Sequence, residues 1–261
     1  MLEQLPGLLL PWFAEHRRDL PWRRDREPYH VWLSEIMLQQ TRVEAVRGYY
    51  LRFLERLPDI AALASAPEDV LLKLWEGLGY YSRVRNLQKA AQCVMEQHGG
   101  EFPQELSAIR ALPGIGDYTA GAIASICFET PTAAVDGNVL RVILRLTACA
   151  DSPADVRVRR RIGEELSAVY PAGHCGDFTQ ALMELGATVC LPNGAPQCGA
   201  CPLRALDSGP IEELKAKYGD VRQIYPLVDP SMTQPNFIIK PSPASELPYV
   251  ESGYVSNPEE V

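Results

Sequence analysis

Glu35 has a sequence context that suits proton transfer. Its neighbours along the chain are apolar: Leu33, Ile36, Met37 and Leu38. A carboxylic acid held among such side chains is poorly solvated when charged, which raises its pKa and makes it a candidate general acid. A glutamate on the solvent-facing side of an ordinary helix is the alternative, and the run by itself leaves both interpretations open.

Asp136 is the second candidate acid and begins the segment Asp136-Gly137-Asn138. Asp is a preferred N-cap and Gly-Asn suits a turn, so the segment predicts a helix over 139–148. The dipole and the amides of that N-terminus favour an ionised carboxylate, which suits a group that stabilises a nearby cation. Capping and catalysis are compatible roles for this residue.

Two glycines one residue apart, Gly114 and Gly116, follow Pro113. They predict a tight turn between helices over 104–111 and 119–128. Without side chains in the turn, unpaired N–H groups at the start of the second helix can face a phosphate. The alternative is an ordinary helix-to-helix turn.

The elements that must position these groups are predicted to be helices. The sequence has no convincing alternating strands before residue 220, so we expect an all-α fold. A helix over 31–57 is expected to be interrupted near Gly48. Other helices are expected over 5–18, 84–98, 155–170 and 177–189, and from 70 to the glycine turn at 77–79. Tyr80 and Tyr81 follow that turn and suit either a stacking wedge between bases or the core.

Three cysteines lie close together as Cys190-x7-Cys198-x2-Cys201, followed by Pro202. This spacing is typical of iron–sulfur or zinc ligation, with incidental clustering as the alternative. A cluster normally has four thiolate ligands, and the chain has no cysteine after Cys201.

Composition predicts a globular protein. The chain has 261 residues, 46% of them hydrophobic, and its apolar runs are far too short to span a bilayer. Residues 2–10 lack the basic start and cleavage site of a signal peptide. The other four cysteines are isolated in apolar segments, which is typical of a reducing compartment, so we expect a cytoplasmic protein.

Net charge weighs against purely electrostatic binding of nucleic acid, because it is −8. An arginine cluster nevertheless offers either a DNA-binding surface or a solvated charged face: Arg17, Arg18, Arg23, Arg24 and Arg26. Residues 208–261 hold eight acidic and four basic side chains and eight prolines. We expect an acidic, largely extended and irregular tail there, with one helix over 211–218 and a strand-like piece over 236–240.

Four motifs together resemble the helix-hairpin-helix DNA glycosylases and, within them, the adenine DNA glycosylase family. The motifs occupy residues 34–41, 77–81, 112–123 and 135–139, and the resemblance extends over about 5–206. It implies base excision repair of double-stranded DNA by a monofunctional hydrolase of N-glycosyl bonds. The substrate would be adenine mispaired with 8-oxoguanine or guanine. The expected enzyme is a monomer with no membrane partner.

The resemblance also implies roles for individual residues. Glu35 would protonate adenine and Asp136 would stabilise the sugar cation, with Asn138 assisting and Tyr118 closing over the site. Gln40 and Tyr80 would insert into the duplex. The residues expected to bind DNA are Gln40, Thr41, Leu78, Tyr80, Gly114, Gly116 and Arg23.

A [4Fe–4S] cluster is a further implication of the resemblance. Cys190, Cys198 and Cys201 would be ligands, and Asp207 stands where the family's fourth cysteine would fall. A three-iron cluster, no cluster, or a zinc site completed by Asp207 or water are the alternatives. Residues 208–261 do not resemble the family's oxoguanine-recognition domain, so the tail's role and the preference for 8-oxoguanine stay open.

The resemblance implies two helical lobes with a DNA cleft between them. One lobe comprises residues 28–134 and contains the hairpin, and the other joins 1–27 to 135–207.

Two other functions are compatible with such a fold. One is an endonuclease III-like glycosylase for damaged pyrimidines, which uses a lysine in the helix after the hairpin. The corresponding position here is Tyr118, and no lysine lies between Lys89 and Lys215. The other is a non-catalytic protein that binds DNA lesions, against which the presence of both Glu35 and Asp136 argues.

Overall fold

The computed structural model describes residues 1–149, 151–192, 196–206, 237–241 and 248–252. The all-α prediction is confirmed for the described residues up to 206. The helices are α1 (Leu5–His16), α2 (Pro28–Leu38), α3 (Val43–Arg56), α4 (Ile60–Ser65), α5 (Glu68–Trp75), α6 (Ser82–Gln97), α7 (Leu106–Ala111), α8 (Asp117–Phe128), α9 (Gly137–Leu146), α10 (Val156–Ser167) and α11 (Cys175–Thr188). Short 3-10 turns lie at η1 (Leu2–Gln4), η2 (Pro21–Arg23), η3 (Cys198–Ala200) and η4 (Arg204–Leu206).

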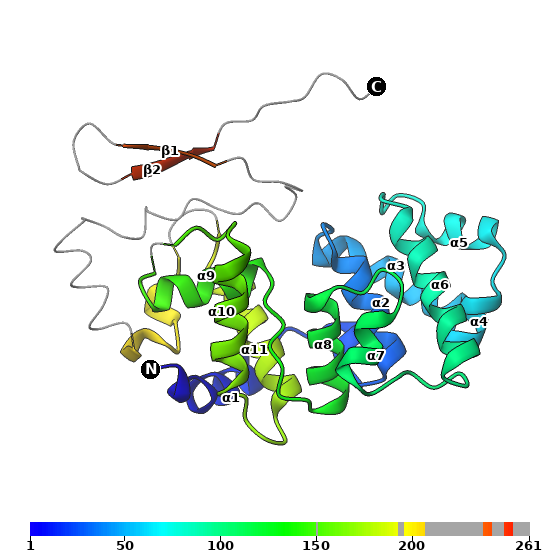
Figure 1. The fold of residues 1–261 in the computed structure, drawn as a ribbon, viewed down its shortest axis with the longest axis horizontal. Coiled ribbons are helices and arrows are strands. Elements are labelled where there is room, and N and C mark those ends of the chain that lie inside the picture. Colours follow the sequence, from blue (N-terminus) through cyan, green and yellow to red (C-terminus); the bar gives the residue numbers. More distant parts are fainter. Residues whose placement is uncertain (150, 193–195, 207–236, 242–247, 253–261) are drawn as a thin grey trace.

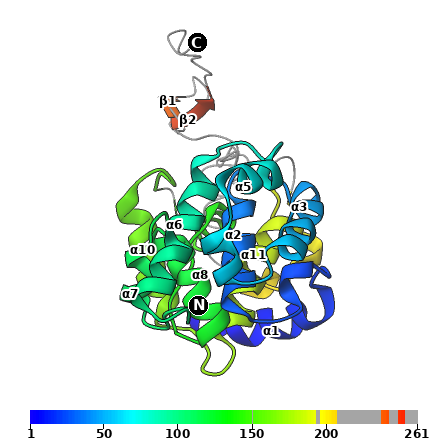
Figure 2. The same cartoon turned by 90° about the vertical axis from the view of Figure 1, so that its right-hand side faces the viewer.

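The helices form two groups, each around its own hydrophobic core (Figure 1). The first core is built by residues between 20 and 134, mainly from α2 to α8. The second combines α1 with α9 to α11. Figure 2 looks at the molecule from the side of the first group, so that the second lies behind it. The chain therefore leaves the second group after α1 and returns to it just before α9.

Helix α2 ends earlier than the sequence pattern predicts. The predicted helix over 31–57 is two helices that are separated at 39–42, and Gly48 lies inside α3. Gln40 has a left-handed backbone with φ of 58°, which stops α2. A single glycine within a helix costs only about 1 kcal/mol, so packing of α3 tolerates Gly48.

Helices α8 and α11 join the two groups with their backbones in close approach. A Cβ on Gly176 of α11 would lie 2.9 Å from the Cα of Ile126 in α8. That distance is shorter than real side chains allow, so only glycine permits this contact.

The tail contains a two-stranded antiparallel sheet in its described part. Strand β1 (Phe237–Pro241) pairs with β2 (Pro248–Ser252), with Phe237 opposite Ser252. The sequence predicted the first strand but not the second, which begins at a proline. The helix predicted over 211–218 lies outside the described residues. None of the described helices has the length and apolar character needed to cross a membrane.

Candidate active site

Glu35 is buried in α2 and bonded to Tyr118. Glu35 is 7% exposed, and the Tyr118 hydroxyl donates a 2.7 Å hydrogen bond to its Oε2. Burial raises the pKa of Glu35 to about 7, a rise that the Tyr118 hydrogen bond opposes and the charge of Asp136 reinforces. Such a group holds its proton near neutral pH and can transfer it.

Asp136 is the N-cap of α9, as its position in the sequence predicts. Its Oδ1 accepts a 2.7 Å hydrogen bond from the Val139 amide, and its Oδ2 accepts one of 2.8 Å from Asn138 Nδ2. Burial raises the pKa of Asp136 above its usual value, and these two hydrogen bonds and the charge of Arg141 oppose the rise. The helix terminus therefore offsets only part of the desolvation that the carboxylate experiences.

Glu35, Tyr118 and Asp136 share one electrostatic environment. The charge of Asp136 contributes to the raised pKa values of both Glu35 and Tyr118. The three residues come from α2, α8 and the start of α9, so both helix groups contribute to the site. The two acids that the sequence analysis singled out are thus close enough for the charge of Asp136 to affect the pKa of Glu35.

Arg141 fixes the amide of Asn138 and was missed by sequence reasoning. Its Nη2 donates a hydrogen bond of 2.9 Å to Asn138 Oδ1 and one of 2.7 Å to the Gly186 carbonyl of α11. With Oδ1 occupied in this way, Nδ2 of Asn138 is directed at Asp136. The one sequence signal that could have indicated this pair is the spacing of three residues between Asn138 and Arg141 on a helix.

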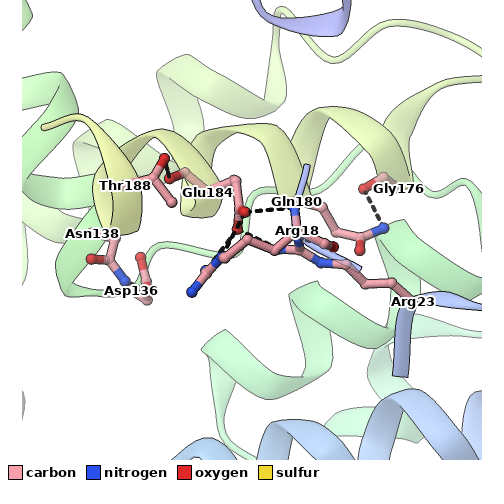
Figure 3. A network of polar contacts seen from close by, with 8 residues as sticks. All are labelled: Arg18, Arg23, Asp136, Asn138, Gly176, Gln180, Glu184 and Thr188. Atoms are coloured by element: carbon pink, nitrogen blue, oxygen red, sulfur yellow. Dashed lines mark hydrogen bonds and ion pairs between the residues drawn. The ribbon is translucent and has the colours of Figure 1, made fainter. Parts of the chain in front are cut away.

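A buried ion-pair network joins the segment after α1 to α11 (Figure 3). The Glu184 side chain is fully buried, and it accepts bonds of 2.7 and 2.8 Å from Arg18 Nε and Nη2 and one of 2.8 Å from Arg23 Nη2. Burial favours the neutral acid, but the two arginines outweigh it and lower the pKa of Glu184 to about 2. Nothing in the sequence marks Glu184, because its partners lie more than 160 residues away.

The arginine cluster is largely paired with acids of the same chain. Arg23, expected to bind DNA, has a side chain only 12% exposed and is committed to Glu184. Arg26 pairs with Glu129 and, at 3.2 Å, with Asp177 of α11. Arg23 is therefore committed to a contact inside the protein, whereas Arg26 is paired but stays 42% exposed, as a solvated charged face would be.

The residues expected to enter the duplex lie in two exposed turns. Gln40 is exposed, and Tyr80 is 56% exposed with φ of 47°. Thr41 is partly buried, and its hydroxyl donates a hydrogen bond of 3.3 Å to the Gln39 carbonyl. Leu78 differs from the others, because it is 7% exposed and packs in the first core.

The predicted glycine turn connects α7 and α8. Gly114 has φ of 77°, a conformation that favours glycine, and Gly116 is the exposed N-cap of α8. In the part of the chain that the structure describes, no side chain caps this terminus. Its first amides therefore remain available to an external acceptor.

The cysteine loop lies against the second core. Cys190 and Cys201 pack there, and Arg145 Nη1 lies 3.3 Å from the Cys190 sulfur. Within the described residues, no group of three or more His, Cys, Asp or Glu side chains is arranged to hold a metal ion. Asp207 lies outside the described residues. The described residues of the loop supply sulfur atoms but not a complete ligand set for a metal ion.

A family model for HhH-GPD superfamily base excision DNA repair proteins matches residues 33–167. This chain belongs to the HhH-GPD superfamily. The match includes Glu35, the glycine turn and Asp136, so the candidate site lies inside the part that defines the superfamily.

Individual DNA glycosylases are also similar to this chain in sequence or in structure. The chain is 46% identical to the adenine DNA glycosylase of Mus musculus over 207 residues, which cover 76% of this chain and 40% of that protein. It therefore spans less than half the length of this curated relative. A solved thermostable thymine-DNA glycosylase matches with a TM-score of 0.72 and 29% identity, covering 79% of this chain and 95% of that one. An endonuclease III–DNA complex matches with a TM-score of 0.66 at 22% identity, covering 82% and 99%, which shows a shared fold.

Proposed function

We propose that this chain is a monofunctional adenine DNA glycosylase of base excision repair, which removes adenine mispaired with 8-oxoguanine or guanine. One observation carries the proposal: Glu35, hydrogen-bonded to Tyr118, shares its environment with Asp136. The 46% identity to a protein named adenine DNA glycosylase supports the choice of base. The proposed partner is double-stranded DNA bound by a monomer, in a cleft between the lobes 28–134 and 1–27 with 135–207.

The first task of such an enzyme is to expose the base. An adenine inside a duplex is unreachable, so its nucleotide must be rotated out of the stack at a cost of a few kcal/mol. Gln40 and Tyr80 are suited to fill the space that is left, because both are exposed and lie in turns. The amides near Gly116 are suited to hold a phosphate of the DNA backbone. Thr41 and Gly114 are also proposed to contact DNA. Leu78 and Arg23 are more buried, and we propose that they support the DNA-contacting residues from inside the protein.

The second task is to cleave the N-glycosidic bond. Glu35 gives its proton to a ring nitrogen of adenine, so that the base leaves with the bonding electrons as a neutral molecule. The sugar then carries positive charge, which the Asp136 carboxylate stabilises, much as paired carboxylates do in glycoside hydrolysis. Water adds its hydroxyl to the sugar carbon, and its proton is released. Asn138 keeps the Asp136 carboxylate oriented.

Asp136→Asn tests this mechanism, because the amide oxygen still caps α9 while the charge is lost. We expect release of free adenine to fall by about a hundredfold or more while affinity for mismatched duplex persists. Asp155→Asn is the matched control, since Asp155 caps α10 on the surface and should tolerate the change. Full single-turnover activity in the Asp136 variant would remove this residue from the mechanism.

Two further assays define the activity. Because Tyr118 stands where a lyase would need an amine, borohydride should trap little covalent adduct with an abasic duplex, and efficient trapping would contradict a monofunctional enzyme. Adenine release opposite 8-oxoguanine is to be compared with release opposite guanine. Equal rates would indicate that this chain does not select the opposite base.

We further propose that Cys190, Cys198 and Cys201 bind an iron–sulfur cluster, with four irons if Asp207 or another group completes the ligands. The spacing of the three cysteines in the sequence supports this assignment, as does the packing of Cys190 and Cys201 against the second core. If bound, the cluster would be held by these cysteines and would take no part in the bond cleavage described above. Anaerobically purified protein should contain iron and absorb visible light. Protein with zinc instead would favour a three-cysteine zinc site.

A further inference from the structure

Arg83 binds two separate turns of the first helix group at the same time. Its Nη1 donates to the carbonyls of Ile36, Met37 and Gln39 at 2.9, 3.2 and 2.6 Å. Its Nη2 donates to the carbonyls of Leu78 and Gly79 at 3.0 and 3.3 Å. One guanidinium therefore contacts five carbonyl oxygens from segments about 40 residues apart in the chain.

The location of these carbonyls explains why an arginine is needed. The last carbonyls of α2 have no partner within the helix, and a cation at a helix C-terminus is favourable. Arg83 itself lies in the first turn of α6, where the helix dipole disfavours a cation. The five acceptors must offset that cost, together with partial burial, which lowers the pKa of Arg83.

Both turns hold an exposed residue in an unfavourable backbone conformation. Gln40 follows Gln39, whose carbonyl Arg83 binds just beyond the end of α2, and its φ is 58°. Tyr80 follows Gly79, and its φ is 47°. Non-glycine residues adopt such conformations only where the surrounding structure enforces them. The Arg83 guanidinium carbon also lies 5.6 Å from the centre of the Tyr80 ring and 5.4 Å from that of Trp75.

We infer that Arg83 is a positioning residue that holds the turns of Gln40 and Tyr80 in a fixed relation, so that both side chains enter the DNA duplex together. The inference rests on the proposed function, in which these two residues occupy the space of the extruded adenine. Arg83 itself touches backbone carbonyls and a ring, and it acts on the reaction only through the two turns.

Arg83→Lys is the decisive variant, because lysine keeps the charge but has no planar fork to span the two turns. On a duplex with paired flanks, we expect adenine release to slow by about tenfold or more, since small displacements of positioning groups have effects of this size. When the same adenine lies in a bubble of unpaired bases, extrusion costs little, and the variant should approach the wild-type rate. Fluorescence of 2-aminopurine at the target position should rise less with the variant than with wild type on the paired duplex.

Arg85→Lys is the matched control on the same helix. Arg85 is exposed and pairs with Glu68 at 2.8 Å, so its replacement should leave both rates within about twofold of wild type. Thermal unfolding of every variant is measured in parallel. If Arg83→Lys does not fold, Arg83→Gln replaces it, since its amide can still donate to one turn.

The outcomes separate the inference from the function on which it rests. An equal deficit on paired and bubble substrates, an unchanged rate on the paired duplex, or loss of folding in both Arg83 variants would overturn the positioning role. If wild-type protein releases no adenine from either substrate, the proposed function fails instead. In that case unequal 2-aminopurine signals from wild type and Arg83→Lys would still support the positioning role, and equal signals would refute it.

Discussion

Gly186 of α11 leaves no room for a side chain beside Asn138 at the start of α9. A Cβ on Gly186 would lie 2.5 Å from the Cβ and 3.0 Å from the Cα of Asn138. Asn138 is the residue that donates to Asp136, and Arg141 binds both Asn138 and the Gly186 carbonyl. The backbone of α11 therefore determines where the candidate catalytic carboxylate lies.

Gly186→Ala should displace Asn138 and the Asp136 carboxylate with it. Overpacking of this kind costs about 1–3 kcal/mol of the free energy of unfolding. We expect adenine release to slow by roughly tenfold to a hundredfold, because the carboxylate no longer lies where charge develops. Gly163→Ala in α10 is the control, since its Cβ would meet only Val135 Cγ2 at 3.7 Å. A folded Gly186→Ala protein with the wild-type single-turnover rate would contradict this reasoning.

Glu35→Gln should stabilise the protein at alkaline pH while it abolishes activity. Because burial raises the pKa of Glu35 from 4.5 to about 7, the folded protein keeps this proton more tightly than the unfolded chain. That contribution is complete below pH 4.5 and is lost as the pH rises to 7, a loss of roughly 3 kcal/mol. The glutamine variant escapes the loss, so its advantage in chemical denaturation should grow between pH 5 and pH 8. An advantage independent of pH would show that ionisation of Glu35 is not its source.

Tyr118→Phe should move the pH dependence of adenine release to higher pH. The Tyr118 hydroxyl stabilises the charged form of Glu35, so its removal raises the pKa of that acid further. An acid that must be protonated to react then stays active to higher pH. Single-turnover rates measured across the pH range test whether the loss of activity at alkaline pH moves to higher pH. If the activity of the variant were instead lost at a lower pH than in the wild type, the assigned effect of the Tyr118 hydrogen bond on Glu35 would be refuted.

Glu184→Gln should weaken the attachment of residues 17–24 to α11. Replacing one partner of a buried ion pair leaves uncompensated charge and costs about 3–5 kcal/mol. Because the arginines lower the pKa of Glu184 to about 2, this stabilisation is present above pH 4.5 and is lost as the pH falls towards 2. Unfolding of the wild type and the variant should therefore converge in acid. Glu165→Gln, at an exposed 3.9 Å pair with Arg161, should have little effect at any pH.

Local sequence signals account for the parts of the site that depend on neighbouring residues. The N-cap at Asp136 and the turn at Gly114 and Gly116 need only a few residues of context, and both were predicted. The apolar neighbours of Glu35 marked it as a candidate acid but left open whether it faces solvent, and its burial is known only from the structure. Resemblance then connected these pieces into one site.

Contacts between distant segments were not predictable in this way. Arg18 and Glu184 are 166 residues apart, and Arg83 and Ile36 are 47 apart, so no periodic pattern joins them. The break after α2 was misplaced at Gly48 because the residues that end the helix, Gln39 and Gln40, have ordinary helix-forming side chains. The carbonyls there are bound by Arg83, which no local rule connects to them.

The close contact of Gly176 with the backbone of α8 leaves these two helices little freedom to move relative to each other. Two main chains that touch directly leave little side-chain volume to repack or compress. Helix α8 carries Tyr118, which bonds Glu35, and α11 carries Gly186, which packs against Asn138, so the contact between the two helices fixes the relative position of residues on both sides of the candidate site. If the protein binds DNA as proposed, we therefore expect the conformational change to occur in the DNA. The duplex should bend, while the protein keeps its shape.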